Sequence, residues 1–225
     1  MDCDLCQRNL STDKMRQRKI KDALIKIKQN DKYFIENPLD YKGAWHTLFN
    51  NSNPIELEIG MGKGKFLIQK AMENPQINYI GIEKVDSVLL RASQKLEQLE
   101  LKNIKIINVD AKDLLNIFEE DEISNLYLNF SDPWPKNGYK KRRLTNKIFL
   151  DLYKEILDED GRIYFKTDNI KLFEYSLIEF NQNNLDFINL SLDLHNSNIE
   201  GNIKTEYEEK FEDKGPIYYI EVKFR

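Results

Sequence analysis

The sequence contains little cysteine and little histidine. Its two cysteines, Cys3 and Cys6, form a C-x-x-C pair that could be half of a zinc site. The two histidines, His46 and His195, do not complete that site by any standard spacing. We therefore expect no metal site, and we interpret both cysteines as reduced thiols in an N-terminal extension.

Long apolar runs are also missing, and none of the runs present could span a bilayer. Charged residues occupy the N-terminal positions where a signal peptide needs an apolar core. These absences predict a cytoplasmic protein without a membrane association. A hydrophobic content of 40% and a charged content of 32% are typical of a globular chain, and 225 residues suffice for one α/β domain with an arm.

The net charge of −4 argues against a nucleic-acid partner unless the basic residues are concentrated, which they are. The first cluster comprises Lys14, Arg16, Arg18, Lys19, Lys21, Lys26 and Lys28. We expect residues 1–30 to form a basic, flexible arm, which is either a solvated terminus or a contact for a phosphate backbone. Residues 31–225 then form a single domain.

Three closely spaced glycines interrupt the sequence after an expected strand at 55–59. Gly60, Gly62 and Gly64 allow a sharp turn and a close approach of the backbone to a ligand. A helix over 65–73 follows, and its free N–H groups face the turn. Strand, glycine turn and helix together form the nucleotide-binding opening of a doubly wound α/β fold.

The spacing of this loop differs from that of a dinucleotide site. A dinucleotide site reads G-x-G-x-x-G, whereas here Glu58 lies two residues before a G-x-G-x-G sequence, and this tighter form resembles motif I of class I S-adenosylmethionine-dependent methyltransferases. A carboxylate suits S-adenosylmethionine (SAM), whose sulfonium and ammonium groups are cationic, and it would repel a pyrophosphate. SAM is therefore favoured over NAD. Another nucleotide, or an ordinary glycine-rich turn, remains an alternative at this point.

Further acids stand at the ends of expected strands. Glu83 closes the strand at 77–83, where a carboxylate can accept from both ribose hydroxyls. Asp110, followed by Ala111, closes the strand at 104–109 and could accept from the adenine amine. Apolar periodicity predicts the remaining strands at 126–130, 161–166, 187–194 and 217–224, and the helices at 85–99, 114–118, 144–157 and 172–180.

The strand at 126–130 runs into Asp132-Pro133-Trp134-Pro135-Lys136. Two prolines stiffen the backbone just beyond the carboxyl end of a strand, where substrates bind in open α/β sheets. Trp134 either packs under this turn or stacks on a base. The second basic cluster follows at once, with Lys136, Lys140, Lys141, Arg142 and Arg143, and would orient a nucleic acid beside the reacting edge.

These motifs strongly resemble the bacterial tRNA (guanine-N7-)-methyltransferase family. The matching elements are the glycine loop with Glu58, Gly81-Ile82-Glu83, Asp110-Ala111, the Asp132–Lys136 turn with its basic tail, Lys166-Thr167-Asp168, and Thr205-Glu206-Tyr207-Glu208. The resemblance covers roughly residues 15–225. The proline turn is specific, whereas the glycine loop alone is not, and residues 1–14 match nothing in the family.

The resemblance implies a Rossmann-like class I methyltransferase fold, with a seven-stranded, mostly parallel sheet, an antiparallel last strand and helices on both faces. It implies methyl transfer from SAM to N7 of guanine 46 in the tRNA variable loop, by a monomer or homodimer without an obligatory protein partner. The implied catalytic residue is Asp132. The implied cofactor contacts are Glu58, Gly60, Gly62, Gly64, Glu83, Asp110, Ala111 and Asp132.

The resemblance also assigns the substrate side. The implied substrate contacts are Lys136, Asp168, Thr205, Glu206, Tyr207 and Glu208, and the implied RNA contacts are Gly138, Tyr139, Lys140, Lys141, Arg142 and Arg143. From the residues alone, Asp168 could instead cap the following helix, and 205–208 looks like an ordinary polar loop.

Two other functions stay open. The first is a SAM enzyme that modifies an exocyclic amine, for which an Asp/Asn-Pro-Pro-aromatic turn is usual; the order Pro133-Trp134-Pro135 matches it imperfectly. The second is a non-catalytic RNA-binding module that retains a nucleotide fold.

Overall fold

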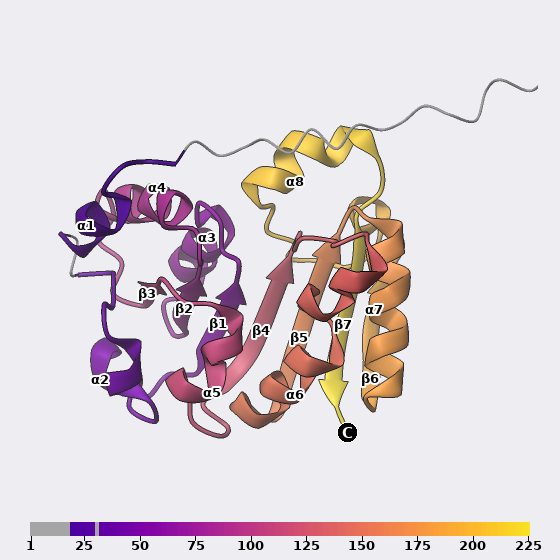
Figure 1. The fold of residues 1–225 in the computed structure, drawn as a ribbon, viewed down its shortest axis with the longest axis horizontal. Helices are drawn as coiled ribbons and strands as arrows, with labels where there is room; N and C mark the ends of the chain where they lie inside the picture. The colour runs from indigo at the N-terminus through magenta and orange to yellow at the C-terminus, as the bar shows by residue number, and fades with distance from the viewer. Residues whose placement is uncertain (1–18, 30–31) are drawn as a thin grey trace, which may run out of the picture.

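The computed structural model describes residues 19–29 and 32–225, which are organised around one seven-stranded sheet (Figure 1). The strands lie in the order β3-β2-β1-β4-β5-β7-β6. Their bounds in that order are Ile104–Ile107, Asn78–Ile82, Ile55–Ile59, Ile123–Asn129, Leu157–Thr167, Tyr218–Phe224 and Leu185–Ser191. β7 runs antiparallel to both β5 and β6, and the other pairs are parallel. This confirms the predicted sheet with its antiparallel last strand.

Helices cover both faces of the sheet. One face carries α1 (Ala23–Lys28), α3 (Lys65–Glu73) and α4 (Asp86–Leu96). The other carries α2 (His46–Phe49), α5 (Leu114–Ile117), α6 (Lys147–Ile156) and α7 (Ile170–Gln182). Strand side chains alternate between the two faces. Leu57 and Ile59 therefore point into the α5–α7 core, which leaves Glu56 and Glu58 on the opposite face.

α1 lies within the stretch predicted to be an arm, but it packs on the domain. Ala23 and Ile27, which are four residues apart, are 1% and 0% exposed and share a core cluster with α4. The folded unit thus includes this helix, because the helix buries an apolar face. The earlier part of the predicted arm, residues 1–18 with Cys3 and Cys6, lies outside the described residues.

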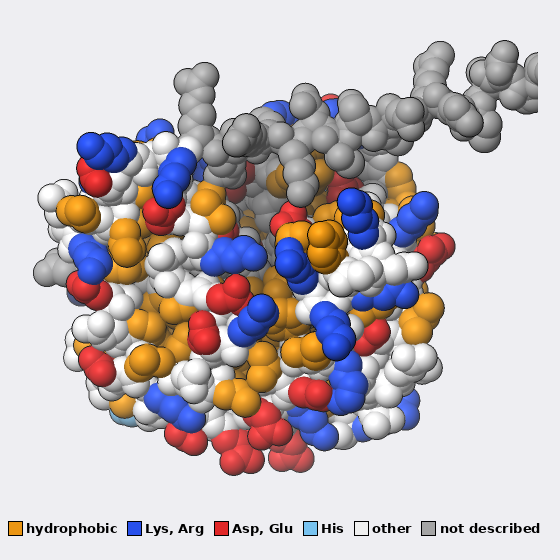
Figure 2. Space-filling model, in the orientation of Figure 1, with side chains coloured by type: hydrophobic (Ala, Val, Ile, Leu, Met, Phe, Trp, Pro, Cys, Tyr) orange, Lys and Arg blue, Asp and Glu red, His pale blue; other side chains and the backbone are white. Residues whose placement is uncertain are grey.

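The chain between β6 and β7 crosses the carboxyl ends of the strands. It contains η4 (Leu194–Asn196), α8 (Glu206–Phe211) and η5 (Glu212–Lys214), and Figure 1 shows α8 above the ends of β4 and β5. Ile203 from this segment packs with Phe66 of α3 and Tyr127 of β4. On the face shown in Figure 2, basic side chains are interleaved with apolar ones around the strand ends below α8.

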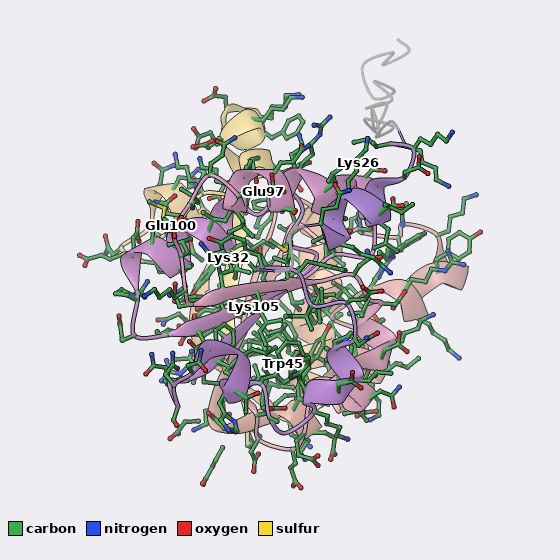
Figure 3. All side chains as sticks on the ribbon, turned by 90° about the vertical axis from the view of Figure 1, so that its left-hand side faces the viewer. Lys26, Lys32, Trp45, Glu97, Glu100 and Lys105 are labelled. Atoms are coloured by element: carbon green, nitrogen blue, oxygen red, sulfur yellow. The ribbon has the colours of Figure 1, made fainter. Side chains whose placement is uncertain are left out.

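The aromatic-rich segment before β1 packs across the domain. Phe34 forms a parallel bridge with Ile106 and so extends the sheet beyond β3. Trp45 is fully buried, and its Nε1 donates to the Ile117 carbonyl over 3.0 Å. Figure 3, viewed from this side, shows Trp45 below β3, with Glu100 above. In the described part of the chain, no helix has both the length and the apolar character needed to cross a membrane.

Candidate active site

A cavity of about 870 Å³ opens at the carboxyl edge of the sheet. Its walls come from the ends of β1, β2, β3 and β4, from the turn after β4, and from α8. Of the residues assigned to the site from the sequence, it brings together Glu58, Gly60, Gly62, Glu83, Asp110, Ala111, Asp132, Arg142, Thr205, Glu206 and Tyr207. Residues as distant in the sequence as Glu58 and Tyr207 therefore meet around one space.

The glycine loop forms one wall and is held by the neighbouring strand. The backbone N–H groups of Gly60 and Met61 both donate to the Ile82 carbonyl, over 2.8 and 3.0 Å. Gly60 and Gly62 have φ of 79° and 59°, and a Cβ on either would meet no protein atom within 4 Å, because both residues border the cavity. Gly64 differs: a Cβ there would lie 2.9 Å from Met61 Cε, so this glycine permits the turn into α3 without bordering the cavity.

Glu58 stands at the end of β1 with its carboxylate buried. Its Oε1 accepts from Asn129 Nδ2 over 2.8 Å, while its Oε2 is buried and has no hydrogen-bond partner among the described residues. Burial raises the pKa of this carboxyl to about 7, although the Asn129 hydrogen bond and the charge of Lys166 oppose the shift. A buried acceptor without a partner that borders a cavity is suited to a cationic or hydrogen-donating ligand.

Glu83 and Asp110 continue this acidic wall on the next two strands. Glu83 accepts from the backbone N–H groups of Gly62 and Val85, over 3.2 and 2.9 Å, which fixes the carboxylate against the glycine loop. Burial raises its pKa, and these two hydrogen bonds oppose the shift. Asp110 accepts from the Lys112 N–H over 3.1 Å and so caps η2 (Ala111–Asp113). Each of these carboxylates retains lone pairs for a ligand.

Asp132 faces this acidic wall from the turn after β4, and its side chain is exposed. The turn is braced by Arg143, which donates to the carbonyls of Pro133 and Trp134 over 3.0 and 3.1 Å. Arg143 is 7% exposed, and its guanidinium lies 4.2 Å from the centroid of the Tyr175 ring. Two of the five N–H donors of Arg143 thus bind the turn, and the residue is buried, unlike the other cations of this segment; its predicted contact with RNA stays a prediction.

The basic segment after the turn forms η3 (Asn137–Arg142), in which no residue is buried. Arg142 lies 4.9 Å from the Trp134 ring and 4.7 Å from the Tyr139 ring. Trp134 is half-buried and borders the cavity, so it packs in the turn and is also accessible to a ligand in the cavity. Lys136, Gly138, Lys140 and Lys141 are exposed and lie outside the cavity wall.

The residues predicted to bind substrate divide into two groups. Thr205, Glu206 and Tyr207 border the cavity from α8. Asp168 lies outside the wall but accepts from the Tyr207 hydroxyl over 2.8 Å, and Asn169, not Asp168, caps α7.

Glu208 is completely buried beneath α8 and does not border the cavity. Its assignment as a substrate contact is therefore not supported by its position. The prediction of a polar loop at 205–208 is wrong as well, because Glu206–Phe211 is a helix. A Thr-x-x-Glu sequence is the signature of a capping box, and Thr205 and Glu208 form one, so this signal was present in the sequence.

Sequence reasoning missed further residues of the cavity wall. Four are cations, Lys63, Lys84, Lys112 and Lys210, and three are the residues before Asp132, namely Asn129, Phe130 and Ser131. The lysines next to Gly62 and Glu83 could have been found from their position at strand ends. The described residues contain no cluster of His, Asp and Glu side chains that could hold a metal ion.

Comparisons with known proteins bear on this site. Residues 52–219 match a family model described as putative methyltransferase. Among curated proteins, the chain is 56% identical over 200 residues to a tRNA (guanine-N(7)-)-methyltransferase of Geobacillus sp. (strain WCH70), covering 88% of this chain and 91% of that one. It is 53% identical to the protein of that name from Bacillus subtilis (strain 168), covering 88% and 94%.

Solved structures with the same fold are methyltransferases of low sequence identity. A 30S ribosomal A1408 methyltransferase from an uncultured bacterium aligns with a TM-score of 0.55 at 18% identity, covering 81% of this chain and 93% of that one. The geranyl diphosphate C-methyltransferase of Streptomyces coelicolor A3(2), in complex with S-adenosyl-L-homocysteine, aligns with a TM-score of 0.53 at 12% identity, covering 77% and 74%. These likenesses identify the fold as that of class I methyltransferases.

Proposed function

The chain belongs to the tRNA (guanine-N(7)-)-methyltransferase family, and we propose that it transfers the methyl group of SAM to N7 of guanine 46 in the tRNA variable loop. One observation carries the proposal: a single cavity joins an acidic wall at the glycine loop to Asp132 on the turn after β4. The acidic wall suits a cationic nucleoside, and the side formed by Asp132 lies next to a basic, aromatic surface.

The residues of the acidic wall fit SAM. Gly60 and Gly62 leave the backbone open toward the cavity, and the free Oε2 of Glu58 can receive a cationic group. Glu83 and Asp110 retain acceptor capacity for the ribose hydroxyls and the adenine amine. SAM supplies an electrophilic methyl group on a positively charged sulfur.

On the substrate side, Asp132 is the catalytic residue of the proposal. Guanine N7 carries a free lone pair, so no proton has to leave it before attack, and no general base is assigned. Holding N7 in line with the methyl group supplies up to roughly 7–11 kcal/mol of the barrier reduction. Asp132 contributes by stabilising the positive charge that the purine gains, or by accepting from the N–H donors of its Watson–Crick edge.

The surface beside Asp132 suits the RNA backbone. Lys136, Lys140, Lys141 and Arg142 are exposed, and phosphate contacts of this kind orient a nucleic acid without reading its sequence. Trp134 and Tyr207 border the cavity and offer aromatic faces for stacking a base. Asp168 would act through its hydrogen bond to Tyr207.

A test of this function distinguishes N7 from an exocyclic amine. An unmodified tRNA transcript is incubated with the protein and SAM, and then cleaved by borohydride and aniline, which cut at 7-methylguanine. We expect one cleavage site, at guanine 46. A second transcript, made with 7-deazaguanosine, lacks N7 but keeps the exocyclic amine, and we expect it to accept no methyl group. Equal methylation of both transcripts would establish the amine as the acceptor, and no methylation of either would favour a non-catalytic RNA-binding module.

A further inference from the structure

α8 forms one side of the cavity, although the helix has only six residues and follows a long segment without strands. We propose that a buried ion pair between Lys166 and Glu208, completed by His195 and Asn202, is the anchor that positions α8 for the tRNA substrate. In this proposal, which rests on the proposed function, Glu208 is a positioning residue that acts through Glu206 and Tyr207 and does not itself touch substrate.

The carboxylate of Glu208 is saturated by protein donors. Its Oε2 accepts from Lys166 Nζ over 2.8 Å and from the Thr205 N–H over 3.4 Å. Its Oε1 accepts from Asn202 Nδ2 over 2.8 Å and lies 2.7 Å from His195 Nε2. A carboxylate offers about four lone-pair sites, so these contacts and the complete burial of the residue leave no access for a guanine.

Lys166 is saturated in the same way. The residue is buried, and its Nζ donates to Glu208 Oε2, to Asn202 Oδ1 and to the Ile203 carbonyl, over 2.8, 2.9 and 2.9 Å. An ammonium group has three donors, and all of them are used. Burial lowers the pKa of Lys166, and the charge of Glu208 opposes this shift. For Glu208, burial acts to raise the pKa, but Lys166 outweighs it and leaves the pKa lowered, which favours the ionised carboxylate.

The position of the pair connects α8 to the cofactor side of the cavity. Lys166 lies near the carboxyl end of β5, in register with Asn129 on β4, and Asn129 donates to Glu58. Two residues after Lys166, Asp168 binds the Tyr207 hydroxyl. The start of α8 is therefore fastened to the same row of strand ends that carries Glu58.

Other ion pairs of α8 are more peripheral. Glu206 pairs with Lys95 on α4, and Glu209 pairs with Lys65 on α3. Every side chain in these two pairs is at least 29% exposed, whereas those of Lys166 and Glu208 are 5% and 0% exposed. Solvated pairs contribute little to stability, and breaking a buried pair is costly because it leaves an unpaired charge. The buried pair is therefore the principal anchor.

The chain offers a matched control for this anchor. Glu221 on β7 is also a buried carboxylate, 4% exposed, and it binds an arginine, Arg162, and an asparagine, Asn189. It lies on the same sheet, does not line the cavity, and its hydrogen bonds run to β5 and β6 and not to α8. Glu221→Gln therefore removes the charge of another buried carboxylate, whose partner Arg162 is 44% exposed, without removing a hydrogen bond to α8.

The experiment measures amide hydrogen exchange of residues 205–211 in the substrate-free protein, and KM for tRNA. For Glu208→Gln we expect exchange in α8 to be at least tenfold faster and KM for tRNA to rise at least tenfold, while the Kd for SAM changes less than threefold. Glu221→Gln should leave all three quantities unchanged. Exchange in α8 that stays at the wild-type rate in Glu208→Gln would overturn the proposal, and this readout does not depend on the protein being a tRNA methyltransferase.

A double-mutant cycle separates positioning from direct contact. If the two residues act as one anchor, Glu208→Gln combined with Lys166→Gln raises KM for tRNA no more than the stronger single variant does. Effects that multiply would instead indicate that Glu208 contacts the substrate on its own.

If the Gln variants do not fold, two other variants test the anchor. His195→Ala and Asn202→Ala each remove one partner of Glu208 at a partly exposed position, and we expect faster exchange in α8 for both. An unchanged rate in both would contradict the anchor.

Discussion

Replacing Asp132 by alanine is expected to lower kcat/KM for tRNA by roughly 10²–10³-fold, the loss typical of removing one group that stabilises developing charge. The side chain is exposed, so the fold should survive, with a change in unfolding free energy of at most about 0.5 kcal/mol. Transfer of a tritiated methyl group to tRNA measures the activity, and thermal unfolding measures the stability.

Asp132→Asn separates the two roles left open for this residue. Asparagine keeps a carbonyl acceptor but loses the charge. A loss as large as that of alanine would assign the effect to charge stabilisation, and a small loss would assign it to orientation of the guanine. Asp113, an exposed acid of η2 that does not border the cavity, serves as the control, and Asp113→Asn should retain activity. Near-normal activity of Asp132→Ala would remove Asp132 from the mechanism.

Glu58→Gln is expected to weaken SAM binding and to stabilise the ligand-free protein at the same time. Burial raises the pKa of Glu58 from 4.5 to about 7. Because the folded state holds this proton more tightly than the unfolded state does, stability falls as pH rises between these two values. At one pKa unit per 1.36 kcal/mol, the cost of the buried charge above pH 7 is about 3 kcal/mol. Glutamine avoids this cost, so Glu58→Gln should unfold at a higher temperature than the wild type at pH 8, but not at pH 4.5.

The affinity for SAM should rise as pH rises, because the ionised carboxylate of Glu58 is the form that attracts the cationic ligand. If binding requires ionised Glu58, the Kd for SAM rises about tenfold from pH 8 to pH 6. Calorimetry over this range measures the effect. Glu58→Gln shows the titration of SAM itself, so the difference between the two profiles belongs to Glu58. Parallel profiles for the two proteins would contradict this role.

The sheet could be predicted from the sequence because each strand carries its own apolar pattern. Strand β1 and the glycine loop lie within ten residues, and the acids at the ends of β2 and β3 follow directly from the strand ends. Exposed and buried members of a charged run look alike in a sequence. Arg143 was therefore grouped with its neighbours, although its guanidinium turns inward to the Pro133 and Trp134 carbonyls.

α8 escaped prediction for a different reason. Its inner side is held by a buried charge, Glu208, whose partner Lys166 lies 42 residues earlier in the chain. A helix of six residues is also too short for a periodicity analysis, which needs a window of about 11–18 residues. Only the capping box marked its start, and that signal was overlooked. Lys166 is buried because β5 lies below α8. The residues around Lys166 in the sequence do not indicate this arrangement.

The most direct test of the shared site is a crystal structure with S-adenosylhomocysteine bound. We expect the ligand in the cavity between the glycine loop and Asp132, with its ribose hydroxyls at Glu83, its adenine at Asp110 and its sulfur on the side of Asp132. A ligand bound elsewhere, or an Asp132 side chain directed away from the sulfur into bulk solvent, would contradict the shared site on which the proposed methyl transfer depends.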